Sequence, residues 1–73
     1  MSSNYWEKHD ILARIEDAVW VALEMGDSFE EAIDKAILIA RARFPDRKRL
    51  IDFVLSEWKA TQSCQDIRSY FNK

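Results

Sequence analysis

Gly26 and Pro45 are the only glycine and the only proline in this chain of 73 residues. Hairpins and sheets depend on turn residues of this kind, so the chain has little means of building β-structure. Apolar residues instead recur every three or four positions along nearly the whole sequence, which is the spacing of an amphipathic helix. The sequence therefore predicts an all-α fold in one domain, residues 1–73: a small bundle of three long helices plus a short C-terminal fourth helix.

The first helix is the longest one predicted. We expect it to begin after Asn4, with Glu7 as the acidic partner of a capping box, and to stop at Gly26. Glycine is the usual terminator because it adopts the left-handed backbone conformation without steric cost. The predicted helix therefore covers residues 5–25 and would be roughly 31 Å long at 1.5 Å per residue.

The second helix has a stronger start signal. Ser28 followed three residues later by Glu31 matches a capping box. The helix is expected to end near Phe44, because the residue before a proline avoids helical backbone angles. Short connections on both sides make consecutive helices neighbours in space.

The last two predicted helices have weaker boundaries. Asp46 is a candidate N-cap for a third helix that covers residues 47–60. A fourth helix begins at Ser63, with Asp66 in the position of the capping acid, or the segment continues the third helix. The sequence leaves both alternatives open.

Each predicted helix carries one apolar stripe, and the four stripes together fill a small core. The expected core residues are Ile11, Leu12, Ile15, Ala18, Val19, Ala22 and Leu23; Phe29, Ile33, Ala36, Ile37, Ala40 and Phe44; Leu50, Ile51, Phe53, Val54 and Trp58; and Cys64, Ile67, Tyr70 and Phe71.

The first helix has a second apolar side that this core does not need. Trp6, Ala13 and Trp20 are spaced by seven residues and lie far around the helix from the core stripe. Either these side chains pack in a groove between other helices of the chain, or they form a surface for another protein. We expect the second alternative, with an interface of Trp6, Ala13, Trp20, Val21, Leu38 and Ile39.

The small size of the chain favours self-association. A chain this short buries only about 60% of its unfolded surface. Cys64 is the single cysteine and His9 the single histidine, so neither an internal disulfide nor a four-ligand zinc site is expected. A tryptophan stripe on a long helix suits an antiparallel helix pair across a two-fold axis, and we expect a homodimer.

Charge is distributed unevenly along the chain. Residues 1–40 contain nine acids and three cations, whereas residues 41–73 contain four acids and eight cations. Five of those cations, Arg41, Arg43, Arg47, Lys48 and Arg49, surround the predicted corner between the second and third helices. They are candidates for contact with nucleic acid or an acidic protein surface, although pairing with acids of the same chain also explains them.

No arrangement typical of an enzyme is present. A single glycine excludes a glycine-rich phosphate loop, Cys64 belongs to an apolar stripe, and a His9–Cys64 pair would require the two chain ends to meet. No cofactor and no membrane contact are expected, and a lone thiol is compatible with the cytoplasm. The sequence therefore predicts a small non-enzymatic protein-interaction or regulatory module, or alternatively a nucleic-acid-binding regulator.

Overall fold

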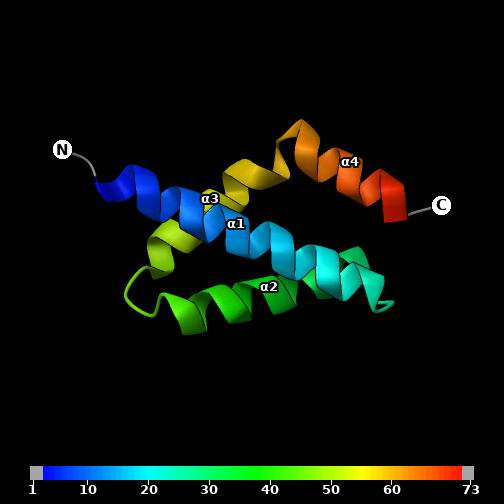
Figure 1. Ribbon diagram of the computed structural model, residues 1–73, viewed down its shortest axis with the longest axis horizontal. Helices are drawn as coiled ribbons and strands as arrows, with labels where there is room; N and C mark the ends of the chain where they lie inside the picture. Colours follow the sequence, from blue (N-terminus) through cyan, green and yellow to red (C-terminus); the bar gives the residue numbers. More distant parts are fainter. Residues whose placement is uncertain (1–2, 72–73) are drawn as a thin grey trace.

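The computed structural model describes residues 3–71, which form four helices in chain order (Figure 1). These are α1 (Ser3–Glu24), α2 (Phe29–Arg43), α3 (Lys48–Lys59) and α4 (Gln62–Phe71). The all-helical prediction is confirmed for these residues. The division into three long helices and one short one holds only roughly, because the lengths fall steadily through 22, 15, 12 and 10 residues.

α1 is the central helix and packs against each of the other three. α2 runs antiparallel along one side of it, α3 crosses it, and α4 lies along the other side near its C-terminal end (Figure 1). The molecule measures 43 × 24 × 14 Å. Because packed helices lie 8–10 Å apart, the 14 Å dimension leaves room for no more than two layers of helices. One side of α1 is therefore left uncovered.

The turn between α1 and α2 forms as the sequence predicts. Gly26 has a φ of 99°, and the N–H groups of Gly26 and Asp27 donate to the carbonyl oxygens of Leu23 and Ala22. This pair of bonds is a Schellman motif, which satisfies carbonyl groups at the end of the helix. Gly26, the residue in the left-handed conformation, therefore lies two residues past Glu24, the last residue of α1.

The start of α2 is also predicted correctly. Ser28 Oγ accepts a hydrogen bond from the Glu31 N–H at 3.1 Å, and Glu31 Oε1 accepts one from the Ser28 N–H at 3.0 Å. These reciprocal bonds satisfy two backbone donors that the helix itself leaves without partners. Phe44 caps the other end of α2, as expected of the residue before Pro45.

The predicted N-caps of α1 and α3 are wrong. α1 begins at Ser3 and so includes Asn4, while Glu7 accepts a hydrogen bond from Arg47 Nε at 2.8 Å. α3 has Arg47 as its N-cap, with no side-chain capping bond, so Asp46 lies one residue too early. Glu7 has the spacing of a capping acid but pairs with Arg47 instead. Asp46 is a residue type that caps helices but lies one position before the observed N-cap.

α4 is a separate helix that begins one residue before the predicted start. The Cys64 N–H donates to Thr61 Oγ1 at 3.2 Å, so Thr61 occupies the N-cap position that we assigned to Ser63. Asp66 does not act as a capping acid, because its Oδ1 accepts from Gln62 Nε2 at 2.9 Å. The break after Lys59 settles the alternative of one continuous helix.

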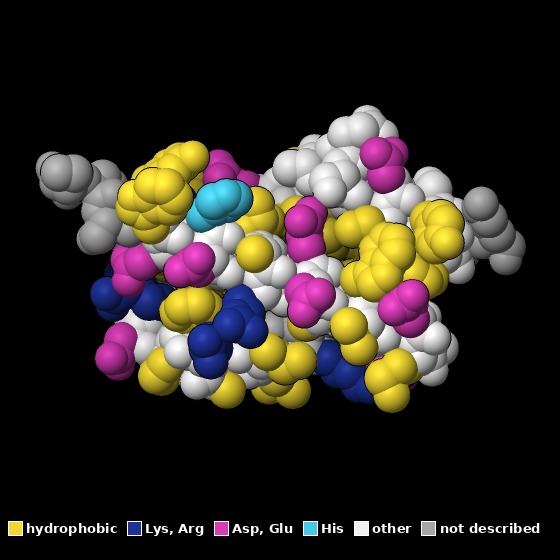
Figure 2. Space-filling view, viewed as in Figure 1, with side chains coloured by type: hydrophobic (Ala, Val, Ile, Leu, Met, Phe, Trp, Pro, Cys, Tyr) yellow, Lys and Arg dark blue, Asp and Glu magenta, His cyan; other side chains and the backbone are white. Residues whose placement is uncertain are grey.

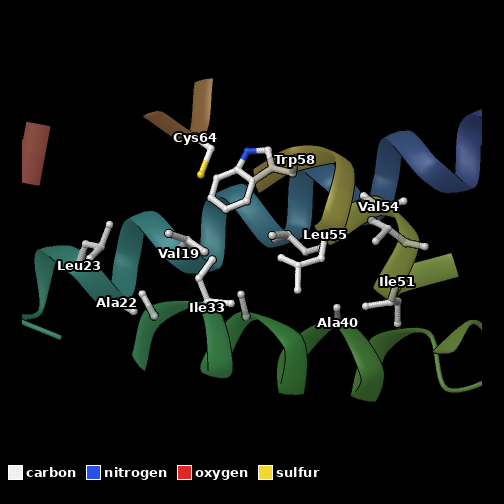
Figure 3. Close-up of a cluster of buried hydrophobic side chains, with 14 residues drawn as sticks. Val19, Ala22, Leu23, Ile33, Ala40, Ile51, Val54, Leu55, Trp58 and Cys64 are labelled. Atoms are coloured by element: carbon white, nitrogen blue, oxygen red, sulfur yellow. The ribbon is translucent and has the colours of Figure 1, made fainter. Parts of the chain in front are cut away.

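The core is a single cluster to which all four helices contribute (Figure 3). Trp58 is its largest side chain, only 2% exposed, and Figure 3 shows its indole beside Cys64. The fully or nearly buried residues are Ile11, Ile15, Val19, Ala22, Leu23, Ala32, Ile33, Ala36, Ala40, Ile51, Val54, Leu55, Trp58 and Cys64.

Two predicted core residues lie at the surface, and two buried ones were not predicted. Phe53 is 47% exposed and Tyr70 is 56% exposed, whereas Leu55 and Ala32 are buried. On α3, neighbours pack against Val54, Leu55 and Trp58, so Phe53 falls on the uncovered flank. Within residues 3–71, no helix is both long enough and apolar enough to cross a bilayer.

Candidate protein-interaction surface

The uncovered side of α1 forms a continuous strip, which we call the outer face of α1. Its residues follow each other at intervals of four and three, so that tryptophan or alanine alternates with an acid. All six are exposed, and Figure 2 shows this side of the molecule with apolar patches near both ends. The outer face consists of Trp6, Asp10, Ala13, Asp17, Trp20 and Glu24.

Trp6 lies at the N-terminal end of the outer face and is 65% exposed. Its ring meets the edge of Tyr5, with centroids 5.2 Å apart, and Tyr5 in turn lies 6.3 Å from the His9 ring. Next to this group, Lys8 Nζ lies 4.8 Å from the centre of the exposed Phe53 ring. These contacts order the aromatic side chains relative to one another but leave most of the Trp6 indole in water.

Trp20 lies at the other end of the outer face and is 36% exposed. Its ring stacks on Tyr70 with centroids 5.5 Å apart and meets Phe71 edge-on at 4.9 Å. The sequence did not predict this cluster, because it assigned Tyr70 and Phe71 to the core. α4 thus covers part of Trp20 and also enlarges the aromatic surface around it.

The remaining predicted interface residues do not all belong to this face. Val21, Leu38 and Ile39 are exposed. Leu38 lies about 200° around α2 from Ala36, which is fully buried, so it points away from the core and from α1. Leu38 therefore lies on a different side of the molecule from the core-facing side of α2, whereas Trp6, Ala13 and Trp20 share one face of α1.

The five cations of the basic corner have different environments. Arg41 Nη2 pairs with Asp52 at 3.3 Å, and Arg47 Nε pairs with Glu7 at 2.8 Å. Among residues 3–71, no ion pair of Arg43, Lys48 or Arg49 is present. Lys48 and Arg49 line a shallow hollow at the start of α3. Pairing with acids of the same chain therefore accounts for two of the five cations.

A polar junction that the sequence did not predict joins three helices. Glu16 Oε2 on α1 accepts hydrogen bonds from Trp58 Nε1 on α3 and from Ser63 Oγ on α4, each at 2.8 Å. It satisfies the only polar side-chain atom of the buried Trp58. Glu16 stands among apolar positions of α1, but its partners are 42 and 47 residues away, so sequence spacing gives no signal.

His9 and Cys64, the two side chains considered for catalysis in the sequence, line separate hollows. His9 lines a groove of about 270 Å³ between α1 and α3, together with Leu12, Val54 and Trp58. Cys64 lines a different hollow, and burial raises the pKa of its thiol above the ordinary value of 9.0. Within the part of the chain that the structure describes, no three His, Cys, Asp or Glu side chains form a cluster suited to a metal ion.

No protein family, curated protein or solved structure matches this chain.

Proposed function

We propose that this protein is a small, non-catalytic interaction module that regulates a protein partner through the outer face of α1. The observation that carries the proposal is the exposure of two tryptophans at the two ends of one helix face. Tryptophan is enriched among the residues that contribute most to protein–protein binding. We place its action in the cytoplasm, because Cys64 is a buried free thiol.

The shape of the chain supports an uncovered binding surface. A compact protein of 8.6 kDa is expected to expose about 4,700 Å². This chain exposes 5351 Å², an excess of about 650 Å². Its radius of gyration of 12.1 Å also exceeds the value of about 11 Å expected for a compact domain of this length.

The energy available from covering Trp6 is large for such a small domain. An indole of about 200 Å² that is 65% exposed offers about 130 Å² for burial. At about 25 cal/mol per Å², this area contributes about 3 kcal/mol as an upper value. Domains of this size have total stabilities of about 4–11 kcal/mol, so covering the face matters on that scale.

Site-specific photo-crosslinking in the native host tests the proposal. Trp6 is replaced by p-benzoylphenylalanine, and the exposed Gln65 of α4 carries the same group as the matched control. We expect a protein adduct at position 6 that is absent at position 65 and is abolished by Trp20→Glu. No adduct at position 6, or equal adducts at both positions, would overturn the proposal.

Nucleic-acid binding is the second candidate, and the start of α3 favours it. α3 has no side-chain cap and no acid in its first turn, and Lys48 and Arg49 line a hollow at this end of the helix, which is an arrangement that suits an anion. This candidate predicts that duplex DNA binds at low salt, that affinity falls steeply with added salt, and that Lys48→Ala with Arg49→Ala weakens it. Absence of binding at about 50 mM salt would end this candidate.

A further inference from the structure

We infer that the partner on the outer face of α1 is a second copy of this chain, bound antiparallel with Ala13 at the two-fold axis. The inference rests on the proposed function, because it names the occupant of the same surface. Three features support it: the spacing of the tryptophans, the distribution of charge between the two ends, and the residues at the midpoint.

The spacing makes the face complementary to its own copy. Trp6 and Trp20 each lie seven residues from Ala13, which is about 10 Å along the helix on either side. A two-fold rotation about an axis through Ala13 therefore brings Trp6 of one copy opposite Trp20 of the other. The exposed indole then meets the aromatic cluster that Trp20 forms with Tyr70 and Phe71.

The two ends of the molecule carry opposite charge. Around the N-terminal half of α1 and the α2–α3 corner, six cations stand against four acids, a net charge of +2. Around the C-terminal half of α1, the α1–α2 turn and the first half of α2, seven acids stand against two cations, a net charge of −5. The first set is Glu7, Lys8, Asp10, Arg41, Arg43, Asp46, Arg47, Lys48, Arg49 and Asp52; the second is Arg14, Glu16, Asp17, Glu24, Asp27, Glu30, Glu31, Asp34 and Lys35.

The charged ends lie on the same edge of the molecule. The α1–α2 turn and the α2–α3 corner are at the two ends of α2, which runs along one side of α1 (Figure 1). Rotation about an axis that is perpendicular to α1 and runs along the plane of the flat molecule exchanges these two ends. The basic corner of one copy therefore lies over the acidic turn of the other.

The midpoint of the face permits close approach. Ala13 has the smallest side chain of the outer face and lies in a hollow with Asp10, Asp17, Arg14 and Arg43. The axis would bring Asp10 of one copy opposite Asp17 of the other, and Arg14 and Arg43 in the same hollow offset these two acids. A methyl group at this position lets the two helices meet without a steric clash while the indoles pack on either side.

Engineered cysteines test both the partner and the orientation. In a Cys64→Ala background, Ala13→Cys places a thiol at the axis, and mild oxidation should then give a covalent dimer in high yield at low micromolar concentration. Glu24→Cys is the matched control on the same face, because antiparallel pairing separates the two copies of position 24 by about 33 Å. The unmodified protein should sediment as a dimer that weakens as salt rises.

The possible results separate this inference from the proposed function. Covalent dimer from Ala13→Cys alone, with both variants retaining their helical circular dichroism, supports the antiparallel pair. Dimer from both variants indicates a parallel or non-specific contact, and dimer from neither indicates a monomer; each overturns the inference. A different protein cross-linked at position 6 by a monomeric chain would sustain the proposed function and overturn the second copy as its occupant.

Discussion

Trp58 and Trp6 place the same side chain in opposite environments of one small molecule. Trp58 is buried at the junction of three helices, where its ring stacks on Phe29 at 6.4 Å and its N–H donates to Glu16. Trp6 lies on the outer face of α1 and contacts mainly its neighbour Tyr5. Trp58 contributes to the core because other helices cover it, whereas the Trp6 indole stays mostly exposed.

Trp58→Ala should produce the largest loss of stability. Removing a fully buried tryptophan costs about 3–5 kcal/mol, which is a large share of the stability of about 4–11 kcal/mol expected of a domain of this size. Chemical denaturation should show a midpoint shifted far towards lower denaturant concentration. Trp58→Phe is the companion variant, since it keeps one aromatic ring in the core and loses the N–H and part of the ring volume, and it should cost less than Trp58→Ala. A native melting curve for Trp58→Ala would contradict the structural role assigned to this side chain.

Glu16→Ala should have the next largest effect, because it leaves the buried Trp58 N–H without an acceptor. The expected cost is about 1–3 kcal/mol. Ser63→Ala removes only the second donor at the same oxygen and should cost about 1 kcal/mol. Denaturation of both single variants and of the double variant measures their coupling. Equal effects of the two single substitutions would show that Trp58 does not depend on Glu16.

Alkaline pH should weaken the folded state through Cys64. Because burial raises the pKa of this thiol in the folded state, the unfolded chain loses its proton first, and stability falls as pH rises above 9.0. Lys35 differs, because its hydrogen bond with Asp27 raises its pKa above 10.5, so its contribution is kept up to that pH. The slope between pH 9.0 and 10.5 should therefore shrink in Cys64→Ala. An unchanged slope would exclude the thiol as its source.

Trp6→Ala should have the smallest effect on the stability of the single chain, within about 0.5 kcal/mol. The reason is that its indole gains little from folding when it is mostly exposed. The free energy of unfolding should be measured at a protein concentration too low for the chains to associate. Iodide should quench the fluorescence of Trp6 strongly and that of Trp58 hardly at all, and single-tryptophan variants separate the two signals. A large loss of stability would mean that Trp6 packs within its own chain.

The local signals that the sequence predicted correctly are those that act over a few residues. Gly26 and the Ser28–Glu31 pair fix their turn with groups that are adjacent in the chain. The caps predicted at Asp46 and Ser63 are local signals that failed, because Arg47 and Thr61 take the capping positions. Two other failures depend on distant partners. Glu7 pairs with Arg47 across 40 positions, and Phe53 is exposed because no helix packs on its side of α3. Periodicity shows that a residue is apolar but does not show which neighbouring helix covers it.

For the candidate surface too, features within one helix could be predicted from the sequence, whereas contacts between helices could not. The shared face of Trp6, Ala13 and Trp20 is a property of one straight helix, so the sequence was sufficient to predict it. The cluster of Trp20 with Tyr70 and Phe71 depends on where α4 folds back, and the separation of Leu38 from this face depends on how α2 is rotated against α1. Neither the rotation of α2 against α1 nor the direction in which α4 folds back can be predicted from a local sequence pattern.

The position of α1 at the centre of the bundle restricts which length changes the chain tolerates. Deleting one residue in the middle of this helix turns everything beyond it by about 100°. Trp20 and Glu24, which are exposed, would then take the buried positions of Val19 and Leu23. Insertions and deletions are therefore expected to be accepted in the connections after Glu24, Arg43 and Lys59, and rejected within residues 11–23.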